Sequence, residues 1–396
     1  MIILPCGQKY WGKKTMKVVK NNSFQSKIKD LIMSYNNSEY GNRFFNEIIS
    51  SDIFIYGAGN AGRMTYELLQ KLNLDIVGFM DRKASVIEKC MNKPVYNVDD
   101  ESINKERAFI IVAFRCSYDE LKSVILWLNN LGYKKICYYH EIYNYIITKG
   151  LSENKLNGIN DVLKLCQEKI FEVASYLSDK RSQELFYNFI EAVLCSNWNK
   201  FSKSDTDLQY FVNNIMFKKG YSRFVDCGAY DGDTAYMLNK VVGQFDKIAL
   251  FEPDMDNFKK LSDKIKKYPI AKEHFLFPCG VWRETALVRF SAGKQSISAI
   301  SEDGNVYIQC VALDDILIDF APTFIKMDIE GAEYEALIGA ESIIKKYSPD
   351  LAISVYHKIE HIWEIPYLIK KINPNYKLYL RTHGLYGMET VLYATC

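Results

Sequence analysis

Residues Phe224 to Thr234 read FVDCGAYDGDT, and this stretch decides the fold of the C-terminal half. Its apolar start is typical of a buried strand, Gly228 and Gly232 indicate a tight turn, and Asp233 or Thr234 is expected to cap a following helix. Strand, glycine-rich turn and helix in this order form the loop that holds nucleotide-type cofactors. The sequence therefore predicts an α/β unit that is built around this turn.

The charge of this turn narrows the choice of cofactor. Asp226, Asp231 and Asp233 crowd it, and the turn contains no Lys or Arg. Phosphate-binding turns instead present bare backbone N–H groups and a helix N-terminus to an anion. Three carboxylates would repel a pyrophosphate, whereas they suit a ligand without phosphate and with cationic groups. S-adenosylmethionine (SAM), with its sulfonium, its α-ammonium and its adenosine, fits that description.

Two later apolar stretches also end in carboxylates. Residues Ile248 to Phe251 lead into Glu252, about 20 residues past the turn, where an acidic residue is placed to accept both ribose hydroxyls. Residues 324–327 lead into Asp328. Ligands of open α/β sheets lie outside the carboxyl ends of the strands, so Asp226, Glu252 and Asp328 are expected to converge. The residues expected to bind the cofactor are Asp226, Gly228, Ala229, Tyr230, Gly232, Asp233, Thr234, Glu252, Pro253 and Asp328.

The C-terminal half resembles the FkbM-type SAM-dependent O-methyltransferases. The resemblance covers roughly residues 205–396 and implies a class I methyltransferase fold and methyl transfer to a hydroxyl, often on a sugar or polysaccharide. Many members are expected to carry Glu two residues before the His of the last motif, but Val355 stands there, so no role of that Glu carries over. The motifs occur in the expected order: VDCGAYDGDT (225–234), FEPD (251–254), ALDD (312–315), FIKMDIEGAE (324–333) and ISVYHK (353–358).

A second glycine turn, GAGNAG at residues 57–62, differs from the first in charge. It contains no carboxylate, and Arg63 lies just inside the helix that is expected to follow. Bare backbone N–H groups, a helix N-terminus and an Arg form a pocket for phosphate oxygens. Asp81 comes after this turn at about the distance in sequence at which an acidic residue binds the ribose of a nucleotide. The residues expected at this second nucleotide site are Gly57, Gly59, Asn60, Gly62, Arg63 and Asp81.

The ligand of the second turn stays open between three readings. IFIYGAGNAG (53–62) and IVGFMDRK (76–83) are similar to the small N-terminal domains of sugar acyltransferases, which implies a nucleotide-activated sugar. The second interpretation is that the turn binds NAD. The third is that this Rossmann unit has lost its ligand and serves only for docking. Tyr118 and Lys122 have the Y-x-x-x-K spacing of short-chain dehydrogenases, but they come too early in the chain and lie in a helix that opens with a capping box. We assign them no catalytic role.

Methyl transfer to a hydroxyl needs an aligned acceptor and a base for its proton. The candidate catalytic residues are Asp328, His357 and Glu330, because Asp328 and His357 end consecutive strands that are neighbours in this fold. Asp328 or Glu330 could instead cap the helix near Gly331. The three side chains could also hold Mg or Mn, although the spacing does not demand a metal. His361 forms an H-x-x-x-H with His357 and is expected to face solvent.

Three further features lie near these residues. Lys326 points to the same strand face as Asp328 and is expected to pair with the acidic cluster, or else to contact substrate. His383 is a secondary catalytic candidate. The Ser-rich segment Ser291 to Ser301 is expected to form either a loop that closes over the acceptor or a plain surface loop.

The chain of 396 residues is long for one domain. We predict an α/β protein: a class I, Rossmann-like methyltransferase fold with a mostly parallel sheet, a separate N-terminal Rossmann-like domain and a helical connector. The expected division is an extension at 1–48, a nucleotide-binding domain at 49–150, the connector at 151–215 and the methyltransferase domain at 216–396.

The composition argues against several classes of partner. The net charge of +2 indicates neither nucleic acid nor an anionic membrane. The ten cysteines show no C-x-x-C pair and no zinc spacing, which fits a reducing cytoplasm. The N-terminus does not resemble a signal peptide, and no stretch approaches the length of a membrane span.

We therefore predict a cytoplasmic SAM-dependent O-methyltransferase that methylates a hydroxyl group of a sugar. This sugar belongs either to a small molecule, such as a nucleotide-activated sugar, or to a glycan. Two other functions stay open. One is a binding module for SAM and a nucleotide sugar without turnover, and the other is an NAD-dependent oxidoreductase that works through the N-terminal domain. A homo-oligomer also stays open.

Overall fold

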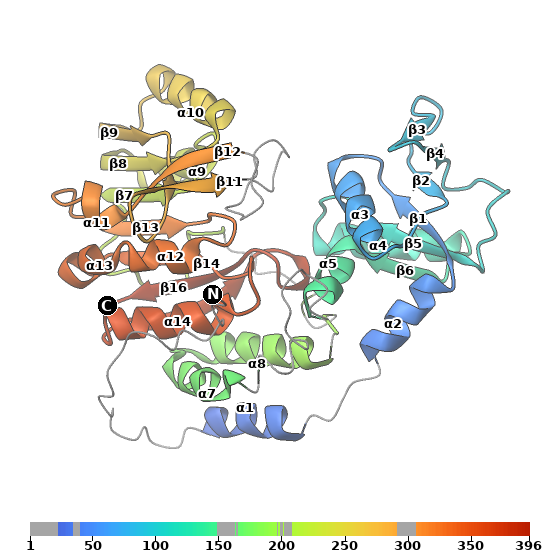
Figure 1. The fold of residues 1–396 in the computed structure, drawn as a ribbon, viewed down its shortest axis with the longest axis horizontal. Coiled ribbons are helices and arrows are strands. Elements are labelled where there is room, and N and C mark those ends of the chain that lie inside the picture. Colours follow the sequence, from blue (N-terminus) through green and yellow to red (C-terminus); the bar gives the residue numbers. More distant parts are fainter. Residues whose placement is uncertain are drawn as a thin grey trace.

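The computed structural model describes residues 23–34, 40–148, 163, 165–195, 197–198, 201, 208–290 and 306–396. Two α/β units lie side by side, and a layer of helices lies beneath the C-terminal one (Figure 1). Among these residues no helix is both long and apolar enough to cross a membrane. The division into four parts at residues 48, 150 and 215 stays a prediction.

The C-terminal unit is built on a seven-stranded sheet in the order β15-β16-β14-β13-β7-β8-β9. Strands β14, β13, β7, β8 and β9 run parallel, and β16 runs antiparallel between β14 and β15. The predicted mostly parallel, Rossmann-like sheet is confirmed. Its strands are β7 (Arg223–Cys227), β8 (Phe245–Phe251), β9 (Ala271–Phe277), β13 (Phe324–Met327), β14 (Asp350–Ser354), β15 (Lys377–Thr382) and β16 (Thr390–Thr395).

Short helices connect these strands, and their ends follow local rules. The side chain of Asp254 caps α10 by accepting hydrogen bonds from the backbone N–H groups of Asp256 and Asn257. Gly232, with a φ of 85°, is the N-cap of α9 and no side chain caps this helix, so the prediction that Asp233 or Thr234 caps it is wrong. The helices are α9 (Asp233–Val242), α10 (Met255–Lys267), α11 (Leu313–Ile316), α12 (Glu333–Ile338), α13 (Glu341–Tyr347) and α14 (His361–Ile372).

A small three-stranded sheet flanks this unit. It pairs β10 (Gly280–Val281) with β12 (Val306–Val311), and β12 with β11 (Ala286–Phe290). Strand β12 runs antiparallel to β11 and parallel to β10.

The N-terminal unit contains its own six-stranded sheet, in the order β3-β4-β2-β1-β5-β6. All neighbours run parallel except β3 and β4. The predicted capping box is present at α4, where Ser117 and Glu120 exchange hydrogen bonds. Its elements are α2 (Tyr40–Ile49), β1 (Asp52–Tyr56), α3 (Asn60–Lys71), β2 (Gly78–Met80), β3 (Lys89–Cys90), β4 (Lys93–Tyr96), β5 (Ala108–Val112), α4 (Tyr118–Asn130), β6 (Lys135–Tyr138) and α5 (Tyr139–Thr148).

In the described part of the connector lie the helices α7 (Gln167–Tyr176) and α8 (Lys180–Cys195). They pack on the C-terminal unit, because α7 contacts α14 and α8 contacts β15. Helix α1 (Ser23–Ser34) lies against both of them, so part of the predicted extension belongs to this layer (Figure 1).

The two α/β units meet through α5 and the short 3-10 helix η2 (Leu385–Gly387). The buried side chain of Asn144 donates a 2.9 Å hydrogen bond to the carbonyl of Tyr386. The rings of Tyr138 and Tyr386 stack with their centroids 5.6 Å apart. These contacts hold the N-terminal unit against the C-terminal edge of the larger sheet.

Candidate active site

The acidic turn is closely packed against the end of β13. Gly228 has a φ of 82°, and a Cβ at this position would lie 2.0 Å from the carbonyl oxygen of Asp328. Gly232 has a φ of 85°, and its Cβ would lie 2.9 Å from a side-chain carbon of Leu261. Only glycine combines positive φ with this lack of space. Gly228 therefore brings the turn next to Asp328, and Gly232 lets it pack against Leu261 of α10.

Asp226 lies beneath the turn and does not line the cleft described below. Its side chain is fully buried, and its Oδ1 lies 2.8 Å from Nζ of Lys326, its register partner on β13. Burial lowers the pKa of Lys326, but the carboxylates of Asp226, Asp328 and Asp233 together outweigh this effect and raise it. The expected pairing of Lys326 is thus observed. The expectation that no cation relieves the turn is wrong, because Lys264 also lies 3.7 Å from Asp231.

Glu252 is a buried carboxylate that follows β8 and contacts the acidic turn. Its side chain is 6% exposed, and its two oxygens accept hydrogen bonds from the backbone N–H groups of Tyr230 (2.8 Å) and Asp254 (2.9 Å). Each oxygen keeps a lone pair for a further donor. Burial raises the pKa of Glu252 to about 7. The carboxylate is therefore held in place and faces the cleft with free acceptor capacity.

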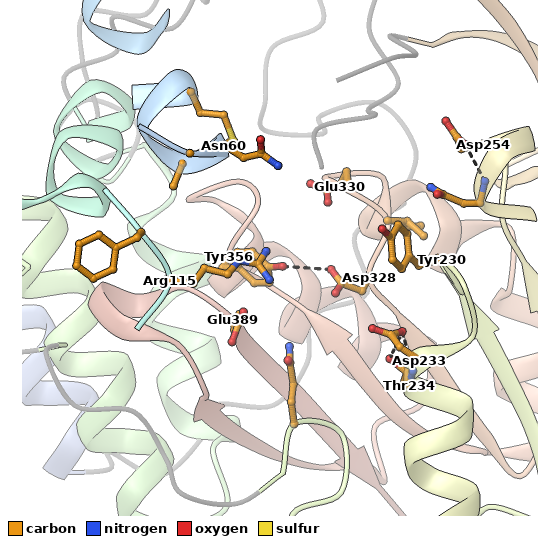
Figure 2. Close-up of a pocket in the computed structure, with 18 of the residues that line it drawn as sticks. Asn60, Arg115, Tyr230, Asp233, Thr234, Asp254, Asp328, Glu330, Tyr356 and Glu389 are labelled. Carbon is orange, nitrogen blue, oxygen red and sulfur yellow. Dashed lines mark hydrogen bonds between the residues drawn. The ribbon is translucent and has the colours of Figure 1, made fainter. Parts of the chain in front are cut away.

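A cleft of about 1910 Å³ is lined by both glycine turns. Figure 2 shows Asn60 and Arg115 on one side of it and Tyr230, Asp233 and Thr234 on the other. Of the residues expected to bind the cofactor, seven line the cleft, whereas Asp226, Ala229 and Gly232 lie behind it. Those seven are Gly228, Tyr230, Asp233, Thr234, Glu252, Pro253 and Asp328.

The N-terminal wall of the cleft differs in part from the predicted nucleotide site. Gly57, Gly59, Asn60 and Asp81 line it, but Gly62 and Arg63 do not. A Cβ on Gly62 would lie 1.9 Å from the carbonyl oxygen of Gly57, so this glycine serves close packing. Arg63 is exposed outside the cleft, because α3 begins at Asn60 and has already turned its side chain away. The cationic side chains of this wall are Arg82, Lys83 and Arg115.

Asp328 is the centre of the C-terminal wall. Its Oδ2 accepts a 2.8 Å hydrogen bond from the hydroxyl of Tyr210, and its Oδ1 accepts one of 3.3 Å from Tyr356 (Figure 2). Nε2 of His357 lies 3.4 Å from the same Oδ1. Three groups from two distant segments thus orient one carboxylate that faces the cleft.

His357 lies behind Asp328 with its ring largely buried. Its Nε2 is 3.5 Å from Glu330, and its Nδ1 is 2.8 Å from Glu333. Burial would lower the pKa of His357, but Glu333, Asp328 and Glu330 together raise it to about 9. For the Glu330 carboxyl, burial acts in the opposite direction and raises the pKa to about 7. The structure therefore brings the three candidate catalytic residues together.

Residues 226–381 match the family model described as the methyltransferase FkbM domain. The C-terminal unit contains an FkbM methyltransferase domain. A methyltransferase of this family uses SAM, which agrees with an acidic turn without phosphate-binding character.

Two solved structures are similar to this chain. The crystal structure of methyltransferase FkbM from Methylobacillus flagellatus KT aligns with a TM-score of 0.70 over 94% of this chain and 99% of that chain. At 20% identity this likeness shows the fold alone, but it covers both α/β units. A putative rRNA-methylase from Clostridium thermocellum aligns with a TM-score of 0.29 and 10% identity, over 44% of this chain and 86% of that chain. The comparison with curated proteins gives no match.

Two histidines near the FkbM site, His361 and His383, have surroundings that differ from those predicted from the sequence. His361 is 3% exposed, and its Nδ1 lies 3.3 Å from Glu333, so the prediction that it faces solvent is wrong. The secondary candidate His383 does not line the cleft and contacts the hydroxyl of Tyr393 at 2.9 Å. The Ser-rich segment 291–301 lies outside the described residues.

A metal ion at the FkbM site stays a prediction. Asp328, Glu333 and His357 offer ligand atoms within 4.8 Å of one another, and Glu330 of the predicted set is not among them. Glu333 Oε1 accepts a 2.9 Å hydrogen bond from the N–H of Ile329 and lies 2.8 Å from His357 Nδ1, so these two atoms are engaged. Glu333 Oε2 and His357 Nε2 are buried without a hydrogen-bond partner.

Several residues of the site had no assigned role in the sequence. Tyr356 and Glu333 lie inside the quoted motifs, so their position was the available signal. Tyr210 comes from the segment before the domain and Arg115 from the N-terminal unit, and no local pattern connects either with Asp328. Glu389 lies below Tyr356 in the view of Figure 2. Burial raises the pKa of Glu389, and the charge of Arg115 only partly opposes this rise.

Proposed function

We propose that this protein is a SAM-dependent O-methyltransferase whose acceptor is a sugar hydroxyl, either on a nucleotide-activated sugar or on a glycan precursor. The observation that carries the proposal is the shared cleft, which the FkbM turn and the N-terminal glycine turn line together. A ligand held by one turn would therefore lie next to the ligand held by the other.

The charges of the two walls support this assignment. The FkbM wall carries Asp233, Glu252 and Asp328, which suit the cationic groups of SAM. The N-terminal wall carries Arg82, Lys83 and Arg115 beside the carboxylates of Asp81, Asp119 and Glu120. We expect the three cationic side chains to bind the phosphates of a nucleoside diphosphate sugar, with its sugar toward Asp328.

SAM supplies a methyl group that is already activated by its sulfonium, so the protein has to align the acceptor and manage one proton. Asp328 is fixed by Tyr210 and Tyr356 and is placed to accept a hydrogen bond from the acceptor hydroxyl. His357, behind it, is the candidate for the final proton acceptor. Glu252 is expected to bind the ribose of SAM, because both of its oxygens face the cleft with acceptor capacity.

The proposal is tested by binding first and turnover second. Calorimetric titrations with SAM, with NAD and with a panel of UDP-, GDP- and CDP-sugars should show SAM and one nucleotide sugar binding independently. Incubation of both with the protein should then give a product heavier by one methyl group. Binding of both ligands without product would favour the binding module, and binding of NAD without SAM would favour the oxidoreductase.

A further inference from the structure

Glu333 is a buried carboxylate that does not line the cleft and yet contacts the candidate base. Its side chain is 0% exposed at the start of α12. Its Oε1 accepts hydrogen bonds from the N–H groups of Ile329 (2.9 Å) and Gly331 (3.3 Å), and it lies 2.8 Å from Nδ1 of His357. An isolated buried charge is costly, so these partners hold the carboxylate in one position.

The contact with Glu333 determines where His357 carries its proton. A carboxylate oxygen only accepts hydrogen bonds, so His357 Nδ1 has to be the donor. In the neutral ring the lone pair is then on Nε2. This Nε2 is buried without a hydrogen-bond partner, 3.4 Å from Asp328 and 3.5 Å from Glu330. The basic nitrogen of the ring therefore faces the carboxylates of the cleft.

His361 completes the surroundings of Glu333. Its Nδ1 lies 3.3 Å from Oε2, on the other side of the carboxylate, without the angles of a hydrogen bond. His361 is 3% exposed, so its ring separates Glu333 from water. The carboxylate is thus enclosed between two imidazole rings, and only one of them reaches toward the cleft.

We propose that Glu333 is a positioning residue that holds His357 in the Nδ1-protonated form, so that Nε2 accepts the proton of the acceptor hydroxyl through Asp328. The proposal rests on the proposed function, methyl transfer to a hydroxyl. In that reaction the O–H bond breaks, its proton bonds to the Asp328 carboxylate that lines the cleft, and Asp328 passes a proton to Nε2 of His357 behind it. The oxygen forms a bond to the methyl carbon, and the electrons of the C–S bond return to sulfur. A carboxylate orients the histidine of serine hydrolases in the same way.

The first test measures the tautomer directly and needs no acceptor, so its result is independent of the proposed function. NMR of the protein labelled in its histidine rings, recorded above pH 9 where His357 is mostly neutral, should show its proton on Nδ1, with the signal assigned by its loss in His357→Gln. Glu333→Leu removes the acceptor of the Nδ1 proton, so the Nε2-protonated form should appear in this variant. A neutral wild-type ring with its proton on Nε2 overturns the proposal even if the variant does not fold.

The second test separates positioning from a purely structural role. Glu333→Gln keeps an oxygen for the two backbone N–H groups, so SAM affinity should stay within about twofold, while kcat falls by about 10²–10⁴-fold. Glu335→Gln is the matched control on the same helix, because Glu335 pairs with Arg283 outside the cleft and should keep full activity.

A double variant completes this comparison. If Glu333 acts through His357, Glu333→Gln combined with His357→Gln should lose no more activity than His357→Gln alone. Losses that multiply would overturn the proposal, and so would an unchanged kcat in folded Glu333→Gln.

Discussion

The two glycine turns share one topology and differ in almost everything that determines a ligand. Both join a buried parallel strand to a helix, and both line the same cleft. Both turns are tightly packed, because a Cβ would lie 2.0 Å from a carbonyl oxygen at Gly228 and 1.9 Å from one at Gly62, whereas Gly59 has open space. The first turn contains carboxylates of its own, whereas the second contains none and faces cationic side chains together with Asp81. Ligand chemistry is therefore set by the residues around the glycines and not by the glycines themselves.

Asp328→Asn should give the largest effect, and it should affect turnover at the FkbM wall without affecting binding at the N-terminal wall. The amide keeps the shape but loses the charge that faces the acceptor hydroxyl and His357, so kcat should fall by about 10²–10⁴-fold. Binding of a nucleotide sugar to the N-terminal wall should stay unchanged in calorimetry. Asp246→Asn, at an exposed ion pair with Lys272, is the control. Intact turnover in Asp328→Asn would remove its catalytic role.

The pH profile should distinguish the two walls next. The pKa of His357 is raised to about 9, so below this pH the ring is mostly protonated and cannot accept a proton. The value of kcat/KM should therefore increase about tenfold per pH unit up to about 9 and then level off. Nucleotide-sugar affinity should not follow this rise. The rise should also be absent from the residual activity of His357→Gln, and a level wild-type profile below pH 9 would contradict the assignment.

Glu252→Gln should weaken SAM alone. The loss of a charged hydrogen-bond acceptor costs about 1.5–3 kcal/mol, so the Kd for SAM should rise about tenfold to hundredfold in calorimetry. Because burial raises the pKa of Glu252 to about 7, wild-type affinity for SAM should also fall as the pH drops below 7. The variant should lack this dependence. Glu273→Gln, at an exposed pair with Lys247, should change neither quantity, and an unaltered Kd in Glu252→Gln would exclude the ribose contact.

Gly59→Val should give the smallest effect, on the opposite wall. The backbone of Gly59 has a φ of −83°, which any residue adopts, and the position has open space, so the fold should tolerate Val. The added side chain would occupy the N-terminal part of the cleft and should weaken nucleotide-sugar binding by about tenfold or more. SAM affinity serves as the internal control. Unchanged nucleotide-sugar affinity would show that this turn is not the ligand site.

The sequence predicted the features that depend on local order. The glycine turn at residues 224–234, Glu252 and Asp328 each follow a strand, and the ends of parallel strands meet at one edge, so the order of strands and carboxylates along the chain is enough to place these residues together. The two Rossmann-like sheets followed from the same alternation of strands and helices.

The predictions that failed depend on contacts between distant segments. Asp226 is withdrawn from the cleft because strand register places it beside Lys326, 100 residues later. His361 was expected in solvent, but it is buried because the fold brings Glu333 opposite to it. Tyr210 donates to Asp328 across 118 residues, and no pattern near Tyr210 indicates this. Register and packing of this kind cannot be read from spacing alone.

The helical connector has a consequence for any attempt to isolate the methyltransferase domain. Strand β15 is the edge of the seven-stranded sheet, and the backbone N–H groups of Leu378 and Leu380 donate to Ser178 and Ser182 in and beside α8. A fragment that begins at residue 216 would leave this edge open to pairing with other chains, which is a common origin of aggregation. It would also leave Arg381, 1% exposed, without its partner Asp179. The smallest soluble catalytic fragment should therefore begin before α7, well upstream of the family match at residue 226.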